Sequence, residues 1–341
     1  MHRSGFVNIV GNPNVGKSTL MNALVGERLS IITSKAQTTR HRIMGIVNGE
    51  DFQIVYSDTP GVLKPNYKLQ EQMLEFSQGA LVDADVLLYV TDVQDTPDKN
   101  AEFLAKVKRL ATPHGQTSPN PTTPPGPLSS HPTARCLRGP REGEKTPSNS
   151  HGPKVFLIIN KIDLTTPETL DNLVSYWQRE LPAAQIFPIS AKERFGIDQL
   201  FAAIKEALPE CPPFFPKDQL TDKSSRFFVN EIIREKILLS YDKEIPYSTE
   251  VEVETFHDEE ESPQHPRGLI RIQAVIYVER DSQKGIIIGR QGAALKKVGM
   301  LARKDLEAFF GKPVFLELFV KVDRDWRSST ARLKHYGYDL N

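Results

Sequence analysis

At 341 residues the chain is longer than one ordinary hydrophobic core, so its length predicts about two domains. Hydrophobic residues make up 39% and charged residues 25%, proportions typical of a soluble globular protein. The formal net charge is zero, so the total charge neither favours nor excludes a nucleic-acid partner. No apolar run approaches the roughly 18 residues of a membrane span, and the first residues lack the apolar core of a secretory signal.

The two cysteines argue against a zinc site and against a disulfide. The two cysteines, Cys136 and Cys211, stand in proline-rich stretches and outside any pattern typical of zinc ligands. We therefore expect neither a zinc site nor a disulfide, which fits a reducing cytosol.

The first motif is a glycine-rich phosphate loop at 11–18, which reads G-N-P-N-V-G-K-S. It lies between an apolar strand expected over 6–10 and a helix expected over 19–25. In that context backbone N–H groups surround a β-phosphate, Lys17 reaches the β and γ oxygens, and Ser18 is placed to ligate Mg²⁺. The alternative is a chance glycine turn. We expect nucleotide contacts from Gly11, Asn12, Pro13, Asn14, Val15, Gly16, Lys17, Ser18 and Thr19.

A polar, aperiodic stretch over 29–42 predicts a mobile loop. Two short strands follow over 43–47 and 52–56, joined by the turn Asn48-Gly49. An aspartate at the end of the second strand can hold Mg²⁺ through water, and a glycine three residues later can offer its N–H to a γ-phosphate. Such contacts exist only while the third phosphate does. The residues concerned are Asp58, Thr59, Pro60 and Gly61.

The next elements are a helix expected over 67–81, a strand over 86–90 and a helix over 101–110. From 112 to 153 the composition changes, with ten of the chain's 25 prolines and almost no large apolar residue. Such a segment cannot bury enough surface to offset its ordering entropy, so we predict a disordered insertion. The alternative is a polyproline ligand around 124–127.

An apolar strand over 155–159 ends in the tetrad N-K-I-D at 160–163. The Asp163 carboxylate can accept hydrogen bonds from the N1–H and 2-amino groups of guanine, a donor pair that adenine lacks. Lys161 is expected along the purine ring, and Asn160 is expected to tie this loop to the phosphate loop. A strand over 185–189 leads to residues placed to recognise the guanine 6-oxygen through the backbone: Ser190, Ala191 and Lys192.

Alternating strands and helices continue to residue 208, with further helices over 167–180 and 197–208. This order predicts an α/β domain, a mostly parallel sheet with helices on both faces. The proline-rich stretch 209–216 predicts a stiff linker. We therefore divide the chain into a nucleotide-binding domain over 1–208, whose insertion spans 112–153, a linker over 209–222 and a second domain over 223–341.

The second domain is predicted to be α+β, in the order helix, strand, strand, helix, helix, strand. An acidic stretch over 250–261 carries seven carboxylates and no Lys or Arg. The periodic segments are a helix over 224–241, strands over 248–255 and 269–278, helices on either side of 289–292, and a strand over 314–322.

The sequence G-R-Q-G at 289–292 is a G-x-x-G loop between two predicted helices. A glycine backbone at a helix N-terminus, with a cationic side chain beside it, suits the backbone of a single-stranded nucleic acid. From 284 to 304 there are six basic residues and no acidic one, and from 267 to 334 fifteen basic residues against seven acidic. The alternative is a capping glycine pair beside a solvated basic face. We predict RNA contacts from Lys284, Gly285, Ile288, Gly289, Arg290, Gln291, Gly292 and Lys296.

Together these motifs resemble the Era family of bacterial ribosome-associated GTPases, which carry a C-terminal KH domain. The matching stretches are 11–18, 37–41, 58–61, 160–163, 190–192 and 286–292. The resemblance covers the chain except for the insertion, whose place near the guanine pocket puts nucleotide affinity in question. It implies that 37–41 is switch I and that Thr39 completes the Mg²⁺ shell beside Ser18 and Asp58.

The resemblance also implies a type II KH domain bound near the 3′ end of 16S ribosomal RNA during maturation of the 30S subunit. It further implies a monomer in the cytoplasm. Some members are associated with the cytoplasmic face of the inner membrane, an association that nothing in this composition favours.

Catalysis is expected to depart from the commonest GTPase pattern. Many GTPases place a glutamine directly after D-x-x-G to orient the attacking water, whereas here that position is the apolar Val62. The resemblance points instead to Asn14, whose side chain in related loops holds K⁺ against the β and γ oxygens. The alternative is that Asn14 is only a turn residue. The catalytic candidates are Asn14, Lys17 and Thr39.

We therefore expect a GTP-hydrolysing switch that binds 16S ribosomal RNA and assists 30S assembly, with GTP and GDP, Mg²⁺ and K⁺ as ligands. One rival is a P-loop small-molecule kinase, which would need no N-K-x-D tetrad. Another is a GTP-regulated protein-interaction scaffold without direct RNA binding.

Overall fold

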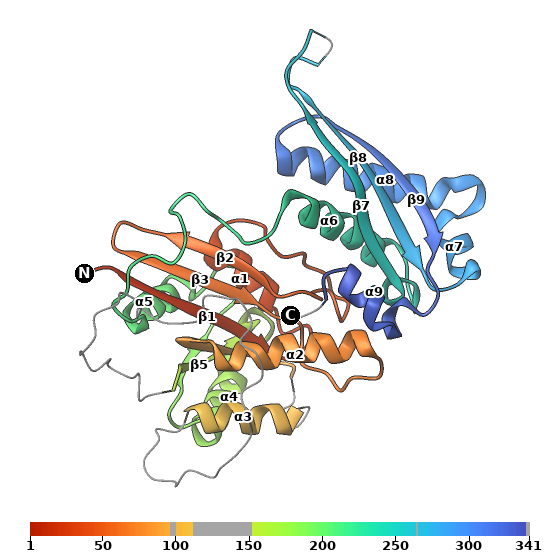
Figure 1. The fold of residues 1–341 in the computed structure, drawn as a ribbon. Helices are drawn as coiled ribbons and strands as arrows, with labels where there is room; N and C mark the ends of the chain where they lie inside the picture. The colour runs from red at the N-terminus through yellow and green to blue at the C-terminus, as the bar shows by residue number, and fades with distance from the viewer. Residues whose placement is uncertain (96–99, 112–151, 264, 339–341) are drawn as a thin grey trace, which may run out of the picture.

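The computed structural model describes residues 1–95, 100–111, 152–263 and 265–338, which form two sheets with their covering helices (Figure 1). Most of the proline-rich insertion, residues 112–151, lies outside the described residues. Its predicted disorder and the polyproline alternative therefore stay predictions.

The first sheet has six strands in the order β2-β3-β1-β4-β5-β6. Neighbouring strands are parallel except for the antiparallel pair β2 and β3, so the predicted mostly parallel sheet is confirmed. Residues 49–51 join that pair, a longer loop than the predicted two-residue turn. The strands are β1 (Arg3–Gly11), β2 (Ile43–Asn48), β3 (Phe52–Asp58), β4 (Val86–Asp92), β5 (Lys154–Asn160) and β6 (Gln185–Pro188).

Helices cover both faces of this sheet, because its central strands are apolar on both sides. On one face α1 and α5 pack over Val7 and Ile9 of β1. On the other face α2, α3 and α4 pack over Leu87 of β4 and Leu157 of β5. The helices are α1 (Lys17–Val25), α2 (Lys68–Val82), α3 (Ala101–Ala111), α4 (Pro167–Glu180) and α5 (Ile197–Ala207).

Residues 209–222, predicted to be a linker with a stiff proline-rich part over 209–216, pack along the first sheet. The Phe214 ring lies 5.0 Å from the Phe6 ring, and the side-chain oxygen of Gln53 accepts the Phe214 and Phe215 amides at 2.6 and 3.0 Å. The Ile46 amide donates to the Leu220 carbonyl at 2.8 Å, so the end of this segment pairs with the edge strand β2.

The expectation of unpaired cysteines is wrong at Cys211, which is disulfide-bonded. The other cysteine, Cys136, lies outside the described residues. Among the described residues, no helix has the length and apolar character that crossing a membrane requires.

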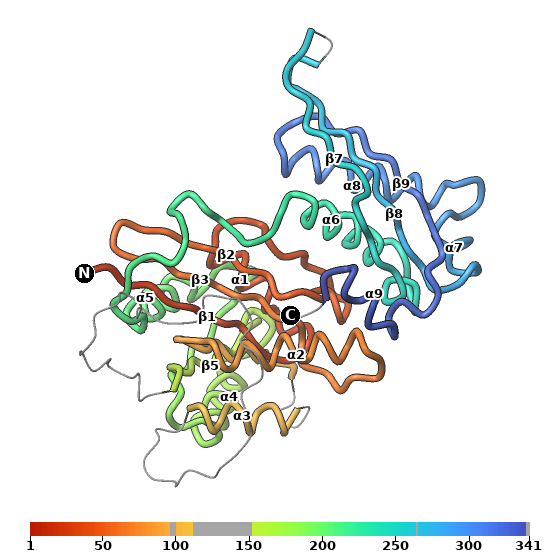
Figure 2. The backbone as a smooth tube through the Cα atoms, in the orientation of Figure 1, coloured from red at the N-terminus to blue at the C-terminus, as the bar shows by residue number. Residues whose placement is uncertain are grey.

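The second domain has the predicted element order and a three-stranded sheet, β7-β8-β9. The pair β7 and β8 is antiparallel, and β8 and β9 are parallel. Figure 2 shows the β7–β8 hairpin extending beyond the rest of the domain. The elements are α6 (Ser225–Ser240), β7 (Thr249–Glu259), β8 (Leu269–Val278), α7 (Asp281–Ile288), α8 (Ala293–Phe310) and β9 (Val314–Val322).

The C-terminal region holds two elements that the sequence analysis did not predict, a 3-10 turn over Trp326–Ser328 and the helix α9 (Thr330–His335). Figure 1 shows α9 beside the N-terminal end of α2 in the first domain, where Lys68 donates to the Thr330 hydroxyl at 3.0 Å. The buried side chains of both domains form one cluster there, which consists of Leu69, Met73, Phe76, Trp326, Leu333 and Tyr338.

Candidate functional site

The phosphate loop joins β1 to α1 at the carboxyl edge of the first sheet. Gly16 caps α1 with a φ of 92°, and a Cβ there would lie 2.3 Å from the side-chain nitrogen of Asn160. A Cβ on Gly61 would lie 2.7 Å from the Cα of Pro13. Glycine is therefore needed at both positions for the backbone to pack this closely.

Lys17 lies at the centre of the loop and is only 6% exposed. Its ammonium group donates to the carbonyls of Gly11 and Asn12 at 3.2 and 2.8 Å. Burial lowers the pKa of Lys17 to about 8, although Asp58 and Asp95 favour the charged form. A phosphate within reach of this ammonium group would favour its charged form further.

The three predicted metal ligands converge from three separate segments. The Ser18 hydroxyl donates to Oδ2 of Asp58 at 2.7 Å, and the Thr39 hydroxyl lies 2.9 Å from that of Ser18 and 3.4 Å from the same carboxylate oxygen. The other oxygen of Asp58 is buried and has no hydrogen-bond partner among the described residues, and burial raises the pKa of this carboxyl. Two hydroxyls and a carboxylate are the hard oxygen donors that Mg²⁺ prefers, so this donor set fits that ion.

The predicted base-recognition residues are also brought together. The Asn160 side chain donates to the Val15 carbonyl at 2.9 Å and accepts the Ala191 amide at 3.0 Å, so it ties the N-K-x-D loop to the phosphate loop as expected. The Ser190 hydroxyl donates to the exposed Asp163 carboxylate at 2.6 Å. Lys192 points away from this cluster, with a side chain that is 81% exposed and paired with the neighbouring Glu193.

Two aspartates that the sequence analysis missed, Asp92 and Asp95, hold Lys161 and Asn12 respectively. The ammonium group of Lys161 donates to the Asn14 carbonyl at 2.7 Å and pairs with Asp92 at 2.5 Å. Asp95 accepts from the Asn12 side chain at 2.6 Å. Both aspartates lie at or just beyond the end of β4, where polar side chains of a parallel sheet meet the ligand edge, and that position was the available signal.

Thr59 and Pro60, which were also predicted near the phosphates, take part in hydrogen bonds that fix the backbone after β3. The Thr59 hydroxyl donates to the Ile9 carbonyl at 2.7 Å, and the Ser77 hydroxyl donates to that of Pro60 at 2.8 Å. Val62 is buried in the apolar core at 5% exposure, as its side chain suggests. Thr19 lies in the first turn of α1.

Asn14 has a φ of 64°, a conformation typical of a turn residue. Its side-chain nitrogen donates to the Ser34 carbonyl at 3.1 Å, so it connects the phosphate loop to the irregular segment 29–42. That segment has no helix or strand, as predicted, but it is held against the second domain. For example, the Lys35 ammonium group donates to the Tyr241 carbonyl and pairs with Asp242.

The G-x-x-G loop forms the junction between α7 and α8. Gly289 has a φ of 70°, and a Cβ there would lie 2.6 Å from the Ala294 Cβ. Gly292 caps α8 with a φ of 77°, but a Cβ there would meet no heavy atom within 4 Å. Arg290 and Gln291 are exposed between these glycines, as a clamp on a nucleic-acid backbone requires.

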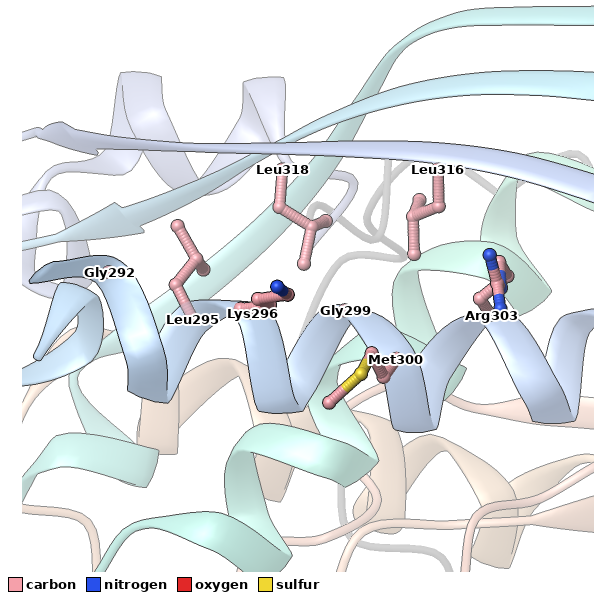
Figure 3. A pocket seen from close by; sticks show the side chains of 8 residues that line it. All are labelled: Gly292, Leu295, Lys296, Gly299, Met300, Arg303, Leu316 and Leu318. Atoms are coloured by element: carbon pink, nitrogen blue, oxygen red, sulfur yellow. The ribbon is translucent and has the colours of Figure 1, made fainter.

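Beside this loop a groove of about 350 Å³ runs between α8 and β9. Figure 3 shows Leu295 of α8 and Leu316 and Leu318 of β9 pointing into it, with Lys296 and Arg303 along its helical side. Of the predicted RNA-binding residues, Gly292 and Lys296 line the groove, and the others lie on α7 and the loop at its end. The sequence analysis missed the six other lining residues, although helical spacing from Gly292 and alternation along β9 mark them: Leu295, Gly299, Met300, Arg303, Leu316 and Leu318.

Comparison with known proteins identifies the family to which the chain belongs. Residues 6–115 match the family described as 50S ribosome-binding GTPase, and residues 244–327 match the KH domain. GTPase Era from Staphylococcus epidermidis is 37% identical over 337 residues, which cover 99% of this chain and 97% of that protein. The chain belongs to the Era family of GTPases. GTPase Era from Staphylococcus haemolyticus matches with the same identity and coverage.

Two solved Era structures share the whole architecture. A variant of Aquifex aeolicus Era bound to GDP·AlF4⁻ has a TM-score of 0.81 at 33% identity and covers 98% of this chain and 99% of its own. Era in complex with MgGDPNP and nucleotides 1506–1542 of 16S ribosomal RNA has a TM-score of 0.81 at 34% identity and covers 99% of both chains. Membership of the Era family makes this protein a GTPase with a C-terminal KH domain, and the small-molecule kinase reading is set aside.

Proposed function

We propose that this protein is a GTP-driven switch whose KH domain binds 16S ribosomal RNA near its 3′ end and assists assembly of the 30S subunit. The observation that carries the proposal is the groove between α8 and β9, which opens beside the G-x-x-G loop with Lys296 and Arg303 on its rim. The Era complex with nucleotides 1506–1542 of 16S ribosomal RNA supports the choice of RNA. The proposal assigns residues 1–208 to the GTPase domain, 209–222 to the linker and 223–341 to the KH domain.

Within the GTPase domain, we assign guanine recognition to Asp163 and phosphate binding to the loop around Lys17. The donor set of Ser18, Thr39 and Asp58 supports Mg²⁺ as the resident ion, as does the MgGDPNP complex of the related Era. When bound, this ion neutralises charge on the β and γ phosphates. Loss of the γ-phosphate removes the contacts that Gly61 and Thr39 make through it, which shifts the two switch segments toward release.

The experiment that tests this function measures binding of a short oligonucleotide with the 3′-end sequence of 16S ribosomal RNA to the full chain. We expect tighter binding in one nucleotide state, GTP analogue or GDP, than in the other, and strong salt dependence because the groove is basic. Absence of binding in every nucleotide state would contradict the proposal and favour the protein-interaction scaffold.

We further propose that K⁺ bound near Asn14 replaces the missing water-orienting glutamine at Val62. The contact of Asn14 with the carbonyl of Ser34 supports this idea, because it places a backbone oxygen atom of the segment 29–42 next to the Asn14 side chain. Exchange of K⁺ for Na⁺ should lower the hydrolysis rate of the native chain, and Asn14→Ala should abolish that ion dependence. Equal rates in both salts would remove K⁺ from the mechanism and leave Asn14 as a turn residue.

The proposals of a monomer, of a cytoplasmic location and of peripheral association with the inner membrane rest on the family resemblance alone. Size-exclusion chromatography with light scattering tests the first, and fractionation of cells tests the other two.

A further inference from the structure

The KH domain holds the backbone on both sides of Thr39, the threonine that we assign to the Mg²⁺ site. On the N-terminal side, the guanidinium of Arg234 in α6 donates to the carbonyl of Thr38. On the C-terminal side, the Arg40 side chain inserts into the KH domain, where it is 0% exposed. Thr39 is therefore fixed through both of its chain neighbours by a domain that contributes nothing else to the nucleotide pocket described above.

Arg40 is held by three acceptors at the start of β7. Its guanidinium donates to the carbonyl of Pro246 at 3.0 Å, to the carbonyl of Thr249 at 2.8 Å and to the Glu250 carboxylate at 3.1 Å. A planar guanidinium can satisfy several acceptors in fixed directions, which an ammonium group cannot do. This contact fixes the position and the direction of the switch segment next to Thr39.

Tyr338, near the end of the described chain, completes this contact. Its hydroxyl donates to the same oxygen of Glu250 at 2.6 Å, and its ring stacks on His41 at 4.2 Å with an interplanar angle of 16°. Burial and the neighbouring Glu250 raise the pKa of Tyr338 well above its usual value, so its hydroxyl remains a donor. Glu250 thus accepts from Arg40 and Tyr338 together, and the C-terminal segment covers switch I.

The contact on the other side of Thr39 is equally well supported. Arg234 is 1% exposed, and it donates to both carboxylate oxygens of Glu231 at 2.8 and 2.6 Å. A buried charge that is paired in this way cannot move far without leaving its partner uncompensated. The Nη2 nitrogen that donates to Glu231 also donates to the Thr38 carbonyl, so Arg234 holds Thr38 from a fixed place.

We propose that Arg40, Arg234, Glu250 and Tyr338 are positioning residues for GTP hydrolysis, through which the KH domain and the C-terminal segment hold Thr39 at the Mg²⁺ site. The proposal rests on the assignment of Thr39 to that site. The hydroxyl of Thr39 already lies 2.9 Å from that of Ser18, so the segment does not have to be ordered when the ion arrives. Preorganisation of this kind lowers the ion concentration that the reaction needs.

The test measures GTP hydrolysis by the full chain as a function of Mg²⁺ concentration. Tyr338→Phe removes one hydroxyl but keeps the stacked ring, and Arg40→Lys keeps the charge but loses the fork of donors. We expect each variant to raise the half-saturating Mg²⁺ concentration by roughly 3- to 10-fold, with a nearly unchanged rate at saturating Mg²⁺. Tyr336→Phe is the matched control, because its hydroxyl donates to Asp323 at 2.8 Å within the KH domain.

A fourth variant, Thr39→Ala, tests the assignment of Thr39 to the Mg²⁺ site separately from the positioning role of Arg40 and Tyr338. If it raises the Mg²⁺ requirement while Tyr338→Phe and Arg40→Lys behave like Tyr336→Phe, the positioning role is overturned and the Mg²⁺ site stands. If Thr39→Ala leaves the Mg²⁺ requirement unchanged, the assignment of Thr39 is wrong and the positioning role falls with it. A lower melting temperature of Tyr338→Phe without a shift in the Mg²⁺ midpoint would mark a purely structural residue and overturn the proposal as well.

Discussion

The molecule carries two glycine loops at helix N-termini, one that we assign to the phosphates of a nucleotide and one that we assign to the backbone of RNA, and the two are built differently. In the GTPase domain Lys17 is 6% exposed, and Asn160 and Lys161 tie the N-K-x-D loop to the phosphate loop by hydrogen bonds. In the KH domain Arg290 and Lys296 are exposed beside an open groove. The enclosed loop suits one small ligand that must be told apart from close analogues, whereas the open loop suits a flexible polymer held by charge.

The strongest test of the enclosed loop is Gly16→Ala. The φ of 92° and the contact at 2.3 Å with Asn160 leave no room for a methyl group. We expect GTP affinity to fall by about 100-fold or more, since the loop has to open to relieve the clash. Titration with a fluorescent GTP analogue measures this.

Gly26→Ala is the control for that variant. Gly26 has a similar φ of 84° at the other end of α1, but a Cβ there would meet nothing within 4 Å. It should cost about 1 kcal/mol of stability and leave GTP affinity unchanged. Equal losses of affinity in both variants would contradict the steric argument.

We assign base selection in the GTPase domain to Asp163, in the N-K-x-D loop. In Asp163→Asn an amide replaces the carboxylate that we expect to face the two guanine donors. GTP affinity should fall by roughly 10- to 100-fold, and preference should shift toward xanthosine triphosphate, which has a carbonyl at the 2-position. Competition between the two nucleotides measures the shift, and an unchanged preference for guanine would count against Asp163.

In the open loop, the two glycines should respond unequally. A Cβ on Gly289 would lie 2.6 Å from that of Ala294, whereas one on Gly292 would point into open space. We expect Gly289→Ala to weaken binding of the 3′-end oligonucleotide by about 10-fold and Gly292→Ala by less, because only the first has to displace the start of α8. Fluorescence anisotropy at fixed salt measures both, and a larger loss in Gly292→Ala would reverse the argument.

The smallest expected effect concerns the rim of the open groove. Arg303→Ala removes one exposed cation, so RNA affinity should fall by roughly 2- to 5-fold and the slope of log affinity against log salt should decrease by about 1. Lys205→Ala is the control, because Lys205 is on α5 and pairs with Asp51 at 2.9 Å. A salt slope that responds to both variants alike would show that the groove has no special place in binding.

The sequence was sufficient to predict the elements whose signals are local and to place the candidate nucleotide-binding residues at one edge of the sheet. The phosphate loop, the D-x-x-G segment and the N-K-x-D tetrad each follow an apolar strand, and parallel strands bring their carboxyl ends to one edge. The residues around Asp58 could therefore be grouped before any contact was known. The G-x-x-G loop was found in the same way, from its place between two helical patterns.

What could not be predicted depends on packing between distant segments. Arg40 reads as one polar residue in a polar loop, yet it is fully buried in the other domain. Tyr338 follows a short helix that lacks a strong pattern, and its partners Glu250 and His41 are far away in the chain. Gly299 deepens the groove only because Leu318 of β9 lies opposite, 3.5 Å from where its Cβ would be. No local periodicity in the sequence identifies contacts between residues so far apart in the chain.

Residues 209–222 determine where the chain can be truncated to give a stable GTPase fragment. They cover an apolar patch of the first sheet made by Phe6, Ile46 and Val55 and pair with the edge strand β2. A fragment that stopped at Leu208 would expose both the patch and the strand edge, two features that promote self-association. The smallest GTPase fragment that remains soluble should therefore end near Asp222, even though its last helix is complete well before that point.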